Sequence, residues 1–368
     1  MNWLFFCAII IDGMVREELY NVIKSDTSVR LILRKEVDEM IEQINWTAIN
    51  SNSNIVFRAE GKKGAVYIRL PHKFHSGLSV VKPDVEKEVL MAVSQLRIGP
   101  QLLLFNESTG ILMTKAIEGY KLSLSLFSSK KFLKEIVHTI KRVHSNAKVN
   151  GSFYPTDEIN GLVQRAQKEG VRFPDDFEEL MVKLNAIYSE PWIKEEAYRV
   201  LSHNDLHYEN FIFSANNSLA ENSTRFRSSG IKNFGQVGVR ILDWEYAAMG
   251  NLFYDLSSLT LYLLPYRKKF VLQTYFGVFR KEDYDRLLKM EVVSSIWYGV
   301  EALYKYSFTQ DAWYLTFAES CFNRVRSRGL LYRIYRASGL RTMRWIIRKK
   351  ISEIWNNENR IQKTNHNP

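Results

Sequence analysis

The segment SHNDLHYENFIF, residues 202–213, places polar and ionisable side chains directly against an apolar run. Two histidines, two acids and two asparagines lie within positions 202–210, and Phe-Ile-Phe follows at 211–213. A solvated turn capped by asparagine side chains is one explanation of such a segment. The alternative is a functional loop at the beginning of a buried strand, and the rest of the chain distinguishes the two.

Asp205 and Asn210 are separated by four residues, a D-x-x-x-x-N spacing that occurs in the catalytic loops of kinases. Phosphoryl transfer needs a carboxylate that orients and deprotonates the attacking hydroxyl, and a second group that faces the magnesium ion of the nucleotide. One turn of chain can supply both. The spacing therefore predicts Asp205 as the catalytic base and Asn210 as a magnesium ligand.

A second apolar run, VRILDWEYAAMG at 239–250, places Val239, Ile241 and Leu242 directly before Asp243. A further carboxylate must approach the same magnesium ion, so we expect this strand to return beside the one that begins at 211. Asp243 is thus the second predicted metal ligand. Each of the two predicted strands has candidate metal-site residues at one end. This arrangement favours a functional site over a solvated turn.

The composition bounds the class of protein. The 368 residues are 46% hydrophobic and 25% charged, as expected for a globular protein of about two domains of roughly 150 residues each. The net charge is +11, but the lysines and arginines are spread along the chain, so we expect a basic surface and no nucleic-acid partner. Cys7 and Cys321 lie far apart, which favours a cytoplasmic location over a disulfide framework or zinc site. The apolar run at 3–11 is too short to span a bilayer, and no transmembrane segment is expected.

The order of elements before this segment indicates a small sheet followed by helices. Apolar residues recur at helical spacing over 14–45, and NIVFRAEGKKGAVYIRLP at 54–71 alternates like a hairpin. Two more strands and a hinge are expected within 99–119. KKFLKEIVHTIKRVH at 130–144 then has the apolar stripe of an amphipathic helix.

Candidate phosphate-binding groups lie in the same region. Three small residues of the turn before the hairpin can approach phosphates through backbone N–H groups, although an ordinary turn fits equally well: Ser51, Asn52 and Ser53. Arg69 ends the second hairpin strand and is a candidate cation for the α- and β-phosphates, held by a glutamate of the next helix. The helix at 85–96 offers Glu86 and Glu88. We select Glu88.

These motifs resemble the aminoglycoside phosphotransferase and choline kinase superfamily, whose catalytic loop reads H-x-D-x-x-x-x-N and whose metal strand reads I-D-W/F-E. ILDWEYAAMGNLFYDLSSL at 241–259 is most similar to bacterial choline kinases. The resemblance spans roughly residues 50–340 and includes four shorter motifs: GP at 99–100, IEG at 117–119, VHS at 143–145 and YFGVF at 275–279. It implies an α+β, two-lobed protein-kinase-like fold with a small antiparallel-sheet N-lobe and a larger, mainly helical C-lobe.

By position, the resemblance implies the same roles as the spacing: Asp205 as the base, Asn210 and Asp243 as magnesium ligands, and Arg69 with Glu88 as the phosphate-positioning pair. Choline kinases commonly have arginine where protein kinases have lysine, so Arg69 is no departure.

Other matching positions are expected to support the loop. His203 and Asp255 are expected to hold the catalytic loop through hydrogen bonds. Glu245, two residues after Asp243, is a candidate to face either the metal or the substrate. NLF at 251–253 departs from the family's more usual Asp-Pro, which affects the local turn rather than the chemistry.

The expected organisation has four parts: an N-terminal helical segment at 1–48, an N-lobe at 49–118, a C-lobe at 119–353 and a disordered tail at 354–368. Within the C-lobe, residues 215–236 form a polar stretch where the family generally has a tight hairpin. Its asparagine- and serine-rich composition predicts a surface loop.

The acceptor site is predicted from SSIWYGVEALYKYSF at 294–308. Trp297, Glu301 and Tyr304 recur at intervals of four and three, so they share one helix face. Aromatic rings beside a carboxylate suit a quaternary ammonium, which is recognised by cation–π contact and charge. Packing of a helical core explains the same periodicity. With the family resemblance, we take these three residues and Glu245 as substrate-binding candidates.

We therefore predict a kinase that uses ATP and Mg²⁺ to phosphorylate the hydroxyl of a small cationic alcohol, with choline as the first choice. Kinases of thiamine, ethanolamine or an aminoglycoside would retain the loop and alter the pocket. The alternative of another class is a nucleotide-binding pseudokinase or effector that acts through a partner. Such a protein usually lacks one of Asp205, Asn210 and Asp243, and all three are present. The sequence leaves the oligomeric state open.

Overall fold

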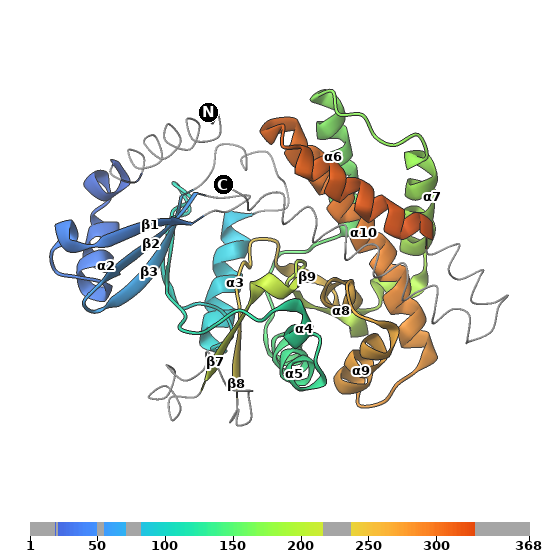
Figure 1. The fold of residues 1–368 in the computed structure, drawn as a ribbon, viewed down its shortest axis with the longest axis horizontal. Helices are drawn as coiled ribbons and strands as arrows, with labels where there is room; N and C mark the ends of the chain where they lie inside the picture. Colours follow the sequence, from blue (N-terminus) through green and yellow to red (C-terminus); the bar gives the residue numbers. More distant parts are fainter. Residues whose placement is uncertain (1–18, 20, 50–54, 71–81, 216–236, 328–368) are drawn as a thin grey trace.

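The computed structural model describes residue 19 and residues 21–49, 55–70, 82–215 and 237–327, which form two lobes (Figure 1). The N-lobe contains a five-stranded sheet, and the C-lobe is mainly helical. The predicted two-lobed α+β fold is confirmed. No helix in these ranges is both long enough and apolar enough to cross a membrane.

The N-lobe sheet is antiparallel and has the strand order β1-β2-β3-β5-β4. Its strands are β1 Asn45–Ile49, β2 Ile55–Gly61, β3 Gly64–Leu70, β4 Leu102–Phe105 and β5 Leu112–Lys115. The predicted hairpin corresponds to β2 and β3, in which Phe57 lies opposite Ile68. Successive side chains of a strand point to opposite faces, so the alternating sequence buries one face, including Phe57 and Ile68.

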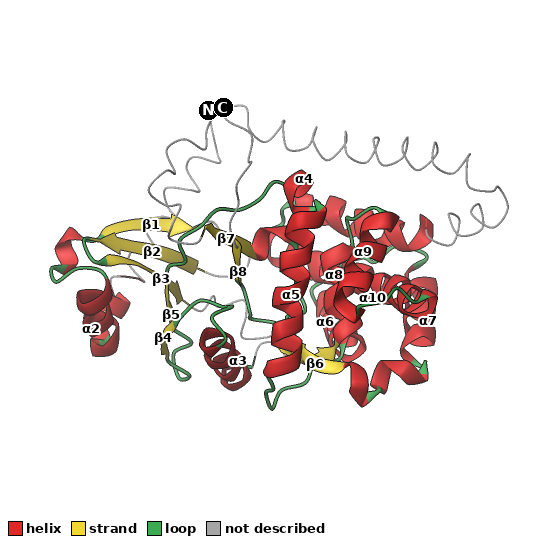
Figure 2. Ribbon diagram, turned by 90° about the horizontal axis from the view of Figure 1, so that it is seen from below, coloured by secondary structure: helices red, strands yellow, loops and turns green. Residues whose placement is uncertain are grey.

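Two helices flank this sheet: α2 Thr27–Glu36 and α3 Pro83–Gln95. Asp26 caps α2, because its Oδ1 accepts a hydrogen bond from Ser28 N at 2.8 Å. Val29 and Leu33 of α2 belong to the same hydrophobic cluster as Phe57. The expected boundary between residues 48 and 49 falls inside β1. Because side chains of α2 and of the sheet belong to one hydrophobic cluster, the predicted N-terminal segment and the N-lobe share a core. Helix α3 lies between the sheet and the C-lobe (Figure 2).

The hinge between the lobes is tied to a strand of the C-lobe. Tyr120 and Phe213 exchange two backbone N–H···O hydrogen bonds, each of 3.0 Å. A Cβ atom at Gly119 would lie 2.5 Å from Ile212 Cγ2 and 2.7 Å from the Phe213 carbonyl oxygen. Only glycine permits this approach, and the motif IEG therefore fixes where the chain enters the C-lobe.

The C-lobe helices are α4 Leu124–Phe127, α5 Lys130–Asn146, α6 Pro155–Lys168, α7 Phe177–Tyr188, α8 Leu252–Thr260, α9 Pro265–Phe276 and α10 Lys281–Thr309. Residues 312–327 are also helical. The apolar stripe predicted for 130–144 is buried along α5, as at Ile136 and Ile140. Figure 1 shows α10 crossing the lobe beside α6, α7 and α8, and its middle part is buried.

Two short antiparallel ribbons carry the catalytic segment. Strand β6 Arg199–Ser202 pairs with β9 Ala248–Asn251, and β7 Phe211–Ala215 pairs with β8 Val237–Ile241. The predicted return of the second apolar run beside the first is confirmed, with Phe211 opposite Ile241. The surface loop was predicted at 215–236, but Ala215 is the last residue of β7; residues 216–236 lie outside the described residues, as does the predicted tail at 354–368.

Candidate active site

The backbone of the loop between β6 and β7 is held by the side chain of Asp255, which lies near the start of α8. Asp255 is 1% exposed, its Oδ2 accepts a hydrogen bond from His203 N at 2.8 Å, and its Oδ1 accepts one from Asn204 N at 2.8 Å. His144 Nε2 of α5 lies 3.0 Å from the same Oδ2. The buried carboxylate therefore fixes the backbone at the start of the loop, in the role that the sequence led us to expect.

The loop is also tied to the segment after β8. His203 Nε2 donates to the Leu242 carbonyl oxygen at 2.7 Å, which leaves Nδ1 to accept from Asp205 N at 3.2 Å. Asn204 Nδ2 donates to the Tyr246 carbonyl oxygen at 2.7 Å. Asn204 adopts φ +69°, a left-handed conformation that the surrounding bonds maintain. These contacts bring Asp205 and the Asp243 segment into one rigid unit.

Asp205 has a side chain that is 16% exposed, and its two carboxylate oxygens have different neighbours. Oδ1 accepts a hydrogen bond from Tyr298 Oη at 3.0 Å. Oδ2 lies 3.4 Å from His207 Nε2 and 3.4 Å from Asn210 Nδ2. Burial raises the pKa of Asp205, but His207 and the Tyr298 hydroxyl outweigh burial, and the pKa lies below its ordinary value. The carboxylate is therefore ionised at neutral pH, as a base must be.

Asn210 and Asp243 lie beside this carboxylate. Asn210 Nδ2 donates to the Asp205 carbonyl oxygen at 2.9 Å, which commits the amide nitrogen and leaves Oδ1 as the atom able to face a cation. Asp243, just after β8, adopts φ +63°. Burial raises the pKa of Asp243, and the negative charge of Asp205 raises it further.

This donor set fits Mg²⁺. A carboxylate and an amide oxygen are hard ligands, and Mg²⁺ completes its shell with water and nucleotide phosphates rather than with a full protein cage. In the described part of the chain, no group of three or more histidine, cysteine, aspartate or glutamate side chains forms a metal cluster. The repulsion that raises the pKa of Asp243 is the kind that a divalent cation between the two carboxylates offsets.

Arg69 pairs with Glu86, and the selection of Glu88 was wrong. Arg69 Nη1 and Nη2 each lie 2.7 Å from a different oxygen of Glu86, in a bidentate pair. Glu88 instead accepts hydrogen bonds from Asn150, including one of 3.0 Å from its backbone N–H. Residues two apart on a helix point about 200° apart, so only one of the two glutamates can face β3.

A sequence signal for Glu86 existed. It lies three, four and seven residues before the buried Val89, Leu90 and Val93, so it shares their face of α3. Its own side chain is 3% exposed. The buried stripe of the helix thus marks the glutamate that reaches the sheet, a signal that the selection of Glu88 did not use.

Glu245 lies close to the same arginine. Its side chain is 4% exposed, and Oε2 is 3.8 Å from Arg69 Nη1. The negative charge of Asp243 also acts on Arg69. The guanidinium therefore has Glu86 and Glu245 as neighbours, and the charges of Glu86, Glu245 and Asp243 all act on it. Ser51, Asn52 and Ser53, the other candidates for phosphate binding, lie outside the described residues.

The predicted acceptor residues divide between the core and a polar network. The Trp297 indole is 2% exposed and packs edge-on against Phe153 at 5.5 Å between ring centroids, and Tyr304 is 6% exposed against Phe308. Glu301 accepts a hydrogen bond from Tyr246 Oη at 2.8 Å, and its Oε1 lies 2.9 Å from Lys305 Nζ. The geometry of Trp297 and Tyr304 is that of core packing, the alternative raised by their periodicity.

Two side chains that the sequence prediction did not include contact predicted site residues: Tyr298 contacts Asp205, and Tyr246 contacts Glu301. A helical signal for Tyr298 was present, because positions 298, 301 and 305 follow the i, i+3, i+7 spacing of one face. The neighbouring Trp297 is rotated by about 100° and points into the core.

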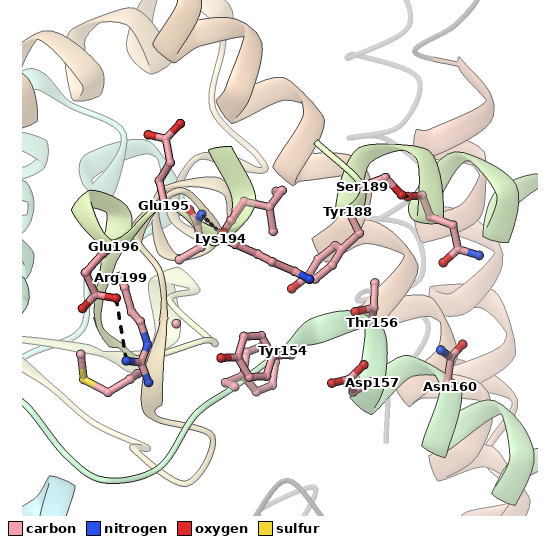
Figure 3. Close-up of a pocket in the computed structure, with 16 residues that line it drawn as sticks. Tyr154, Thr156, Asp157, Asn160, Tyr188, Ser189, Lys194, Glu195, Glu196 and Arg199 are labelled. Carbon is pink, nitrogen blue, oxygen red and sulfur yellow. Dashed lines mark hydrogen bonds and ion pairs between the residues drawn. The ribbon is translucent and has the colours of Figure 1, made fainter. Parts of the chain in front are cut away.

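A separate cleft lies on the helical side of the C-lobe. It has a volume of about 780 Å³ and is lined by residues of α6, the end of α7, the segment at 193–199 and β9. Figure 3 shows Tyr154 and Asp157 on one side of this space and Lys194 and Arg199 on another. None of the predicted site residues lines it, so its volume says nothing about the catalytic loop.

The loop with its buried aspartate support, the second carboxylate after β8 and the arginine–glutamate pair of the N-lobe define the class: a kinase-like phosphotransferase. The model of the choline/ethanolamine kinase family matches residues 42–269, more than half of the chain, and the chain belongs to this family. The predicted superfamily is confirmed, and the protein is an ATP-dependent phosphotransferase that acts on an alcohol group.

Solved structures share this fold at low sequence identity. Choline kinase LicA from Streptococcus pneumoniae is 16% identical with a TM-score of 0.61, over 82% of this chain and 100% of that one. A choline/ethanolamine kinase family protein from Mesorhizobium loti is 17% identical with a TM-score of 0.64, over 85% and 94%. An ethanolamine kinase from Plasmodium vivax is 15% identical with a TM-score of 0.63, over 84% and 93%. No curated protein sequence matches the chain.

Proposed function

We propose that this protein transfers the γ-phosphoryl group of ATP to the hydroxyl of a small amino alcohol, with choline as the first acceptor to test and ethanolamine as the second. The observation that carries the proposal is the Asp205 carboxylate, which accepts a hydrogen bond from Tyr298 and lies on a loop whose backbone is fixed by Asp255. The family to which the chain belongs supports the same acceptor class.

Asp205 is the proposed general base. It accepts the proton of the acceptor hydroxyl as the oxygen attacks the γ-phosphorus, and it holds that oxygen in line with the leaving group. The side chain of His207 is 33% exposed beside Asp205, so the acceptor can approach from this side of the loop. The His207 pKa is lowered by burial but raised more strongly by Asp205, which favours an imidazolium that stabilises the ionised base.

The donor side is formed by residues of both lobes. Asn210 Oδ1 and the Asp243 carboxylate would hold Mg²⁺, which would neutralise the charge of the phosphates. Arg69, fixed in a bidentate pair with Glu86, directs its guanidinium toward the α- and β-phosphates. These groups align the nucleotide, and positioning is the main contribution that a protein makes to phosphoryl transfer.

The acceptor's cation is assigned to the network of Tyr246 and Glu301. Tyr246 Oη and Lys305 Nζ both contact Oε1 of Glu301. Oε2 is then the oxygen through which this carboxylate can attract an ammonium group. A trimethylammonium has no N–H donor and depends on aromatic faces and charge, whereas a primary ammonium can also donate a hydrogen bond to Oε2. This additional hydrogen bond is the chemical reason for testing ethanolamine as the second candidate.

The test is a panel of acceptors with Mg-ATP, scored by acceptor-dependent ADP release. Choline, ethanolamine, thiamine and an aminoglycoside separate the proposed acceptors from the kinases that would retain the loop and alter the pocket. Asp205→Asn is the matched control, because it preserves the shape of the side chain and removes the base. We expect turnover with choline or ethanolamine, lowered by about 10²- to 10⁴-fold in the control. ATP binding without phosphorylation of any of these alcohols would favour the pseudokinase alternative.

A further inference from the structure

A phenol from the long helix of the C-lobe contacts the catalytic carboxylate. Tyr298 Oη of α10 lies 3.0 Å from Asp205 Oδ1, although the two residues are 93 positions apart in the chain. The same hydroxyl is hydrogen-bonded to Ser258 Oγ of α8. Ser258 is 3% exposed. The contact is thus a chain of three side chains, Ser258, Tyr298 and Asp205, that runs from α8 to the loop.

The direction of both hydrogen bonds follows from the charge of Asp205. An ionised carboxylate can only accept, so the Tyr298 hydroxyl must donate its single proton to Oδ1. The phenol oxygen then accepts from the Ser258 hydroxyl. Burial raises the pKa of Tyr298 well above its ordinary value, and the charge of Asp205 raises it further, so the phenol keeps this proton.

The orientation of the Asp205 carboxylate depends on this bond. The torsion that turns an aspartate carboxylate about its Cβ–Cγ bond has broad, weak preferences, so neighbouring donors set the plane. The contacts of Oδ2 with His207 Nε2 and Asn210 Nδ2 are both 3.4 Å, which is long for a hydrogen bond. The 3.0 Å bond from Tyr298 is shorter than either of these contacts.

We propose that Tyr298 is a positioning residue, which sets the plane of the Asp205 carboxylate through its hydrogen bond to Oδ1 and is itself oriented by Ser258. This inference rests on the proposed role of Asp205 as base. Asp255 and Ser258 lie three residues apart on one face of α8, so a single helix fixes both the backbone of the loop and, through Tyr298, its reactive side chain.

The first test is Tyr298→Phe, which retains the ring and removes only the hydroxyl. We expect kcat to fall by about 10- to 100-fold, because a misplacement of about 1 Å at the reacting centre can cost a factor of 10². The KM for Mg-ATP should be little changed, since the variant does not touch the phosphate-binding groups. Tyr306→Phe, on the same helix, is the matched control and should retain the parent kcat. A Tyr298→Phe variant with the kcat of the control would overturn the proposal.

A double-mutant comparison separates positioning from a general effect on the fold. In the Asp205→Asn background there is no base to orient, so adding Tyr298→Phe should lower the residual rate no further. An equal additional loss in that background would contradict the proposal. Should Tyr298→Phe fail to fold, Ser258→Ala provides the second variant. It removes the donor to the phenol and should lower kcat by a smaller factor. An unchanged kcat would contradict the role of Ser258 in orienting Tyr298.

A measurement without turnover keeps this inference distinct from the proposed function. In a crystal structure of Tyr298→Phe, we expect the Asp205 carboxylate to rotate away from the position seen in the parent. An unchanged carboxylate plane would overturn the positioning role even in an active enzyme. If instead the parent phosphorylates none of the acceptors but the carboxylate rotates in the variant, the proposed function fails and the structural inference stands.

Discussion

Glu86→Gln, compared with Glu88→Gln, tests the ion pair that joins α3 to the sheet. Arg69 is 16% exposed and Glu86 is 3% exposed, and both guanidinium contacts are 2.7 Å. Removing one partner of such a buried pair costs about 3–5 kcal/mol, because the other charge remains buried. Glu245, at 3.8 Å from Arg69, is too distant to form an equivalent bidentate pair.

The expected readouts are the melting temperature and the KM for ATP. A loss of about 3 kcal/mol lowers the melting temperature by roughly 4 °C, because the unfolding entropy of a 368-residue chain is about 0.8 kcal/mol per kelvin. The KM for ATP should rise in the same variant, because the guanidinium is no longer held toward the phosphates. Glu88→Gln should change both quantities far less, since Glu88 contacts the exposed Asn150. Equal effects of the two substitutions, or a larger effect of Glu88→Gln, would refute this reasoning.

Other predictions concern the catalytic carboxylates, the buried indole and the polar stretch. Asp205→Asn should keep nucleotide binding and lower turnover by about 10²- to 10⁴-fold, and near-normal turnover would exclude the base role. Asp243→Ala should abolish magnesium-dependent turnover in a folded protein; unchanged thermal stabilisation by Mg-ATP would show that it is no metal ligand. Trp297→Leu should cost about 2–4 kcal/mol of stability with little change in the choline KM, because the indole packs in the core. A raised choline KM at constant melting temperature would restore its substrate role. Replacing 216–235 by a short glycine-containing turn should leave activity within a few-fold, because the flanking strands are already paired; loss of folding would contradict a surface loop.

The sequence alone determined the fold and the polar ends of two catalytic strands. The alternation over 54–71 predicted the β2–β3 hairpin, since a strand with one buried face must alternate with period two. The spacing of Asp205 and Asn210, and the apolar run before Asp243, indicated residues that the structure brings together. These signals are local, because each depends on the conformation of one short segment or on a pair of adjacent strands.

The tertiary structure alone decided which side chains meet. On α3 the sequence offered two glutamates, and the packing of the helix against β3 selected Glu86. On α10 it indicated a face with Trp297, whereas the contact with Asp205 comes from Tyr298, one residue further along. Successive residues of a helix are rotated by about 100°, so the periodicity shows which residues share a face. It does not show which other element each face contacts. That depends on how α3, α8 and α10 are rotated when their apolar surfaces pack, an outcome determined by contacts between residues far apart in the chain.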